Sequence, residues 1–69
     1  MSFKLQPQAR EKLAAAVRVA GAKRTAEAVG LNVATIATTI SGIREPMPAT
    51  ARVIEAAGPV LDALIAGAS

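Results

Sequence analysis

Several residue types that carry chemistry are missing from this sequence. It has no Cys, His, Trp or Tyr, and its one aromatic residue is a Phe. Without Cys there is no disulfide or thiolate metal site, and without His the commonest general base and metal ligand is missing. The acidic residues are scattered, and we find neither a nucleophile with its base nor a Gly-rich phosphate loop. The sequence therefore predicts no catalysis, no metal, no cofactor and no small-molecule ligand.

Long apolar runs are also missing. No stretch approaches the roughly 20 apolar residues that cross a bilayer, and the first residues, MSFKLQPQAREK, lack the apolar core of a signal peptide. A membrane-surface peptide is disfavoured too, because the basic residues and the apolar C-terminal segment lie at opposite ends. We expect a cytoplasmic protein without a membrane partner.

The apolar content is high but consists mainly of alanine. Hydrophobic residues make up 52% of the 69 residues, a length that suits one small domain over residues 1–69. A core of such small side chains is thin, so close helix packing or a partner subunit must supply part of the stability.

The positive charge is concentrated in the first part of the chain. The net charge is +3, and before position 25 a single acid, Glu11, opposes the basic residues Lys4, Arg10, Lys12, Arg18, Lys23 and Arg24. A basic half on a small domain suggests a polyanionic partner. The alternative is a surface whose charge serves only solubility.

Apolar spacing and helix-ending residues predict an all-α fold, a compact bundle of about five short helices. The first, after Pro7, ends at Gly21, and the second spans about 23–29. Residues 42–48 form a loop with two prolines, and the fourth helix spans 49–57, with Val53, Ile54 and Ala57 inside. The last spans about 59–66.

The segment 32–41 needs a decision between strand and helix. Its VATIATTI core has high sheet propensity, yet no second β-rich run exists with which a strand could pair. Asn32 is a good N-cap. On a helix, Ile36, Thr39 and Ile40 share one face, and the opposite face holds Ala34, Ala37, Thr38 and Ser41. We therefore predict a helix.

Together the second and third helices predict a helix-turn-helix at about 22–42. Ala26 is small enough for a close crossing, and Gly30 can adopt the left-handed conformation of the turn. Val29, Leu31 and Ile36 would fill the corner between the helices.

From Ala22 to Gly42, with the Pro-containing loop and the helix ATARVIEAAG that follow, the sequence resembles the lambda-repressor and Cro-like helix-turn-helix domains of phage and bacterial regulators. The resemblance covers about residues 8–66, and its most specific parts are Ala26, Gly30, Ile36 and the ISG that ends at Gly42. It implies a transcriptional regulator, a repressor rather than an activator. Such a protein binds a short two-fold operator in double-stranded DNA as a homodimer, in a bacterial cell or phage-infected host.

In that family the helix after the turn enters the major groove, so the resemblance assigns base readout to residues of the segment 32–41. The candidates are Asn32, Val33, Ala34, Thr35, Ala37, Thr38 and Ser41. The sequence departs from the family pattern, because Asn32 alone could bind a base in a bidentate way. Methyl groups of Val33, Ala34 and Thr38 can instead contact thymine methyl groups.

Three basic residues are candidates for phosphate contacts. Lys23 and Arg24 stand at the positive end of the first motif helix, and Arg44 follows the recognition helix in the loop. Arg10, Lys12 and Arg18 are expected to be solvated instead.

The C-terminal helix is the candidate dimer interface. Its apolar residues cover more of the helix circumference than one neighbouring helix can bury, and they are Val60, Leu61, Leu64 and Ile65. We expect Leu61 or Leu64 near the two-fold axis. The alternative is that this helix folds back over the first helix and buries all four.

A second function stays open. The charge-poor recognition helix also suits a small helical protein-interaction module, such as an antitoxin, anti-repressor or adaptor, that has a helix-turn-helix frame without DNA readout. Steep weakening of duplex binding with salt would separate a DNA-binding protein from such a module.

Overall fold

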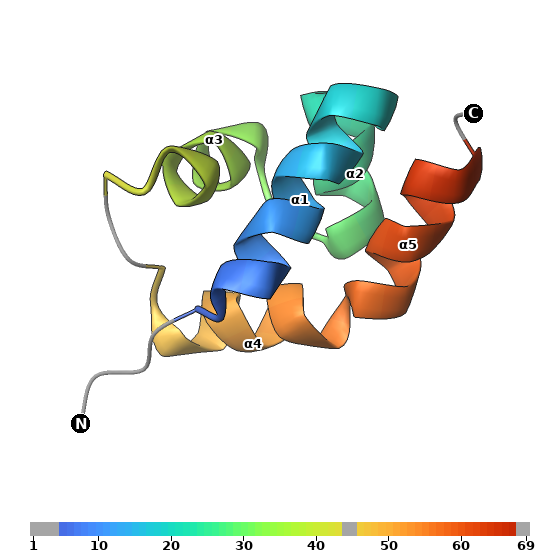
Figure 1. The fold of residues 1–69 in the computed structure, drawn as a ribbon. Helices are drawn as coiled ribbons and strands as arrows, with labels where there is room; N and C mark the ends of the chain where they lie inside the picture. The colour runs from blue at the N-terminus through green and yellow to red at the C-terminus, as the bar shows by residue number, and fades with distance from the viewer. Residues whose placement is uncertain (1–4, 44–45, 68–69) are drawn as a thin grey trace.

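A computed structural model describes residues 5–43 and 46–67, and over these ranges the protein has five α-helices and no strand (Figure 1). The helices are α1 (Pro7–Ala20), α2 (Ala22–Val29), α3 (Val33–Ser41), α4 (Pro48–Ala56) and α5 (Gly58–Gly67). The predicted all-α bundle of about five short helices is confirmed. Observed boundaries lie within one or two residues of the predicted ones.

α1 is the central helix and contacts each of the other four (Figure 1). α4 runs along the lower edge of the view, α5 lies at the right and α3 at the left. Every helix contributes to one core, and its fully buried large apolar side chains are Leu13, Ile36, Ile54 and Leu61. α1 thus serves as the common packing surface on which the sites of the other helices are positioned.

Small side chains allow the helices to approach closely. Ala16 of α1, Ala26 of α2 and Ala51 of α4 are all buried in the core. Because interaxial distance depends on the side chains at the contact, alanine at these positions lets the helices pack near the short end of the usual range. The alanine-rich composition is therefore compatible with a filled core despite its few large residues.

The turn between α2 and α3 depends on one backbone conformation. Gly30 has φ 78° and ψ 26°, in the left-handed region, and the N–H groups of Gly30 and Leu31 both donate to the Ala26 carbonyl, at 2.9 and 3.0 Å. A Cβ at Gly30 would meet nothing within 4 Å, so glycine is favoured there by backbone conformation and not by lack of space.

α3 begins at a side-chain cap. The Asn32 Oδ1 atom accepts a hydrogen bond from the Thr35 backbone N–H at 2.7 Å, which satisfies one of the unpaired donors at the start of the helix. The segment with high sheet propensity is therefore a helix, as predicted, and Asn32 is its N-cap.

One sequence prediction about packing is wrong. Val53, expected inside, is 40% exposed, because α4 turns Ala51 and Ile54 toward the core. Two features went unpredicted. Leu5, which precedes α1, is buried in the core with 3% of its surface exposed. Thr25 is fully buried, and its hydroxyl has no hydrogen-bond partner among the described residues.

The helices are too short, or too polar, to cross a bilayer: none in the described ranges meets both requirements for a membrane span.

Replacing Ile36 tests how α3 is held on the core. Ile36 is fully buried, so Ile36→Ala should lower the free energy of unfolding by about 2–4 kcal/mol and Ile36→Val by about 0.5–1.5 kcal/mol. Ile43→Ala is the matched control, because Ile43 is 84% exposed and its loss should change stability by less than about 0.5 kcal/mol. Urea unfolding followed by circular dichroism measures all three. Equal effects at positions 36 and 43 would contradict the packing.

Candidate nucleic-acid interface

α3 is anchored to the protein by one face. Ile36 is fully buried, Thr39 is 2% exposed and Ile40 is half-buried against the core. These side chains pack where α3 meets α1 and α2. The predicted inner face of the helix is confirmed.

The opposite face of α3 makes no contribution to the core. Val33 is 44% exposed, and the other exposed residues of the helix are Ala34, Ala37, Thr38 and Ser41. Asn32 is exposed at the start, and Thr35 is half-buried. All seven predicted readout residues therefore lie together on or beside one surface of a single helix, which we call the outer face of α3.

The exposed hydroxyls of this face are bonded to the helix itself. Thr38 Oγ1 donates to the Ala34 carbonyl at 2.9 Å, and Ser41 Oγ donates to the Thr38 carbonyl at 2.9 Å. Each hydroxyl has one hydrogen to donate. Thr38 therefore keeps its methyl group and its hydroxyl lone pairs for other contacts, whereas the Ser41 oxygen also accepts from the Ile43 backbone N–H at 3.4 Å.

A shallow groove of about 260 Å³ runs beside the outer face. Asn32, Ala34, Thr35, Thr38 and Thr39 line one wall, and Pro46, Met47 and Thr50 line the other. None of these side chains is charged. The groove thus separates α3 from the start of α4 and leaves α3 free along one side.

Two of the three predicted phosphate contacts are neighbours on α2. Lys23 and Arg24 are both exposed in the first turn of α2, and this first turn contains no acidic residue. Arg24 also lines a groove of about 210 Å³ with Val60, Ala63, Leu64 and Gly67, which puts it beside α5. Arg44 lies outside the described residues.

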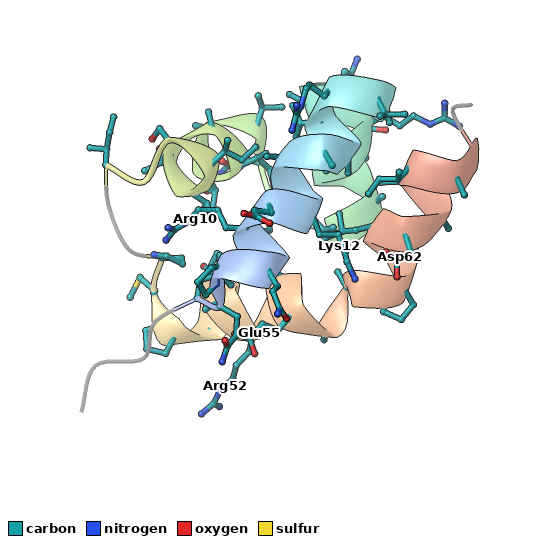
Figure 2. The ribbon with its side chains drawn as sticks, in the orientation of Figure 1. Arg10, Lys12, Arg52, Glu55 and Asp62 are labelled. Carbon is teal, nitrogen blue, oxygen red and sulfur yellow. The ribbon has the colours of Figure 1, made fainter. Side chains whose placement is uncertain are left out.

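Two basic residues of α1 are not solvated in the way the sequence suggested. The Lys12 Nζ atom lies 3.2 Å from an Asp62 carboxylate oxygen, and Figure 2 shows the two side chains pointing toward one another across α1 and α5. Arg10 is half-buried, whereas Arg18 is exposed as expected. The Lys12–Asp62 pair is partly exposed, so its contribution is limited to about 0–1 kcal/mol.

On α5 the four predicted interface residues separate into two kinds. Leu61 is fully buried in the protein's own core, so it has no surface left for a second copy, and the expectation for Leu61 is wrong. Leu61 belongs to the core cluster that α5 shares with α1 and the other helices. Val60 is 40% exposed, and Leu64 and Ile65 are half-buried. An apolar surface therefore remains on α5, smaller than the sequence indicated.

Among the described residues, no three acidic side chains converge on a point where a metal ion could bind. The two features of the candidate interface that sequence reasoning missed are the groove beside α3 and the internal bonding of its hydroxyls. The internal bonding of the hydroxyls could have been predicted from the sequence. Thr38 and Ala34 are four residues apart, the spacing at which a helical Thr bonds a preceding carbonyl.

Comparison with known proteins gave no match: no family model, no curated protein and no solved structure is significantly similar to this chain.

Proposed function

We propose that the protein binds double-stranded DNA by inserting α3 into the major groove, and that it acts as a transcriptional regulator of the repressor type. The observation that carries the proposal is the division of α3 into a buried face that fixes it and an outer face that the fold leaves unused. A helix with its side chains is about 10–12 Å across, and the major groove is about 12 Å wide. Small side chains on the outer face would let the backbone of α3 sit deep in that groove.

The charge distribution supports the same partner. The net charge is +3, and Lys23 and Arg24 are exposed in the first turn of α2, where the helix dipole adds positive potential. Phosphate contacts from such residues fix the orientation of a protein on a duplex but do not read its sequence. We assign this role to Lys23 and Arg24, and to Arg44, which follows α3 in the sequence.

A second copy would complete the site. One recognition helix covers only a few base pairs, and a two-fold dimer presents two such helices to the two halves of an operator. The apolar surface of α5 offers Val60, Leu64 and Ile65 for this contact. We therefore propose a homodimer joined through α5, with Leu64 near its axis.

The competing function is a protein-interaction module with the same frame. It is favoured by the absence of any charged residue in α3 and by the large apolar side chains exposed next to it, Ile43 at 84% and Met47 at 75%. A module of this kind would bind a protein through the end of α3 and the groove beside it. It would show little affinity for duplex DNA at any salt concentration.

Selection from random duplexes followed by salt titration tests the DNA-binding proposal. Affinity should fall steeply with salt, and Lys23→Ala and Arg24→Ala should each reduce the slope of log affinity against log salt by about one. Arg52→Ala is the matched control: it removes the same charge, and Figure 2 shows Arg52 projecting from α4 on the side away from α3. Its slope should equal that of the wild type.

Binding that is absent or independent of salt would reject the DNA-binding proposal in favour of the interaction module. A wild-type slope in both Lys23→Ala and Arg24→Ala would remove these two residues from the interface.

Two valines with the same exposure test the dimer. Val53 and Val60 are both 40% exposed, but only Val60 lies on α5. A lysine in an apolar interface is costly, so Val60→Lys should weaken dimerisation by about tenfold or more, which corresponds to about 1.4 kcal/mol, while Val53→Lys should leave it unchanged. Sedimentation over a wide concentration range gives the dimerisation constant of each variant, both without operator and with it. A wild-type protein that stays monomeric and binds one copy per operator would contradict the dimer.

A further inference from the structure

We propose that α3 recognises thymine, through contact between its exposed methyl groups and the C5-methyl groups of a T-rich half-site. The inference rests on the proposed function and adds the chemistry by which bases are read. It follows from what the outer face of α3 offers to a base pair and from what it lacks.

Hydrogen-bond donors are confined to the beginning of the helix. The Asn32 side chain uses its oxygen in the N-cap, so its NH₂ group remains available to donate. Thr35 is half-buried in the same first turn, and its side chain lines the groove beside the outer face. Beyond the first turn, the hydroxyl hydrogens of Thr38 and Ser41 are both used by backbone carbonyls. The middle and end of the outer face therefore present no free side-chain donor.

This arrangement selects against G·C pairs. The major-groove edge of guanine displays two acceptors, N7 and O6, which a specific contact would satisfy with Arg or Lys. α3 has neither residue. Packing it closely on a G·C pair would remove water from these acceptors without replacing their hydrogen bonds, which is unfavourable.

The same face matches a T·A pair. Thymine displays its C5-methyl group in the major groove, and adenine displays its N6 amino donor beside an acceptor. Val33, Ala34, Ala37 and Thr38 present methyl groups over consecutive turns of α3, and the bonded hydroxyl of Thr38 still has lone pairs that can accept from adenine N6. Beyond its first turn, α3 can therefore make apolar contact with thymine and can accept a hydrogen bond from adenine.

Removing single methyl groups from the DNA and from the protein tests the inference. In the selected duplex, each thymine of one half-site is replaced in turn by deoxyuridine, which removes only the C5-methyl group. At two or more positions the affinity should fall about fourfold, the loss expected for one buried methyl group. Thymines outside the site serve as controls and should tolerate the change.

Protein variants identify which methyl group makes each contact. Thr38→Ser removes one methyl group and keeps the hydroxyl that bonds Ala34. In this variant the deoxyuridine change facing position 38 should lose its effect, while the changes at other positions keep theirs. Val33→Thr, which keeps the shape of the side chain, should abolish the effect at a different thymine. Both substitutions are at exposed positions, so wild-type circular dichroism is expected for each.

The outcomes separate the two proposals. Salt-dependent binding to duplex DNA in which every deoxyuridine change is neutral, or in which the selected site has no preferred thymine, would overturn thymine recognition and leave the DNA-binding function standing. No duplex binding at any salt concentration would overturn both.

Discussion

The left-handed conformation of Gly30 is the constraint on which the exposed helix depends. It ends α2, brings the N–H groups of Gly30 and Leu31 to the Ala26 carbonyl, and lets the chain turn at once into the Asn32 cap of α3. An L-residue would adopt this conformation only at a cost of about 1–2 kcal/mol. With the corner fixed, Ile36 enters the core, and the direction of the outer face follows from the helical repeat.

α3 is stable because of where it packs. It has nine residues, below the roughly 12–15 that form an isolated helix in water, and its Val, Ile and Thr residues have low helix propensity. The buried side of Ile36 and Thr39 and the N-cap compensate. The outer face adds nothing to the core, so the stability of the fold does not require it to be rich in methyl groups and free of charge. This is the physical reason why a role in binding is proposed for it.

Local rules were sufficient to predict most of the fold. The glycines, prolines and the Asn32 cap mark where helices start and stop, and the spacing of Ile36, Thr39 and Ile40 correctly predicted which side of α3 is buried. These signals act within one or two helical turns, so they are legible without knowing the tertiary arrangement.

Features that depend on contacts between distant segments were not predictable in the same way. Leu5 is buried because it packs on the core just before α1 begins, and Val53 is exposed because α4 presents Ala51 and Ile54 to the core. Leu61 and Val60 are neighbours in the sequence, yet one is fully buried and the other is not. Their apolar character is the same, and only the rotation of α5 against α1 distinguishes them. The position of Arg24 beside α5 likewise depends on the packing of α2 against α5.

The outer face of α3 is the surface proposed to meet DNA. Nuclear magnetic resonance of the ¹⁵N- and methyl-labelled protein, titrated with the selected duplex, tests it residue by residue. We expect the largest shift changes at the amides and methyl groups of Val33, Ala34, Ala37 and Thr38, with little change at the buried Ile54 of α4. The largest changes on α4 or α5, with the α3 signals unaltered, would contradict it.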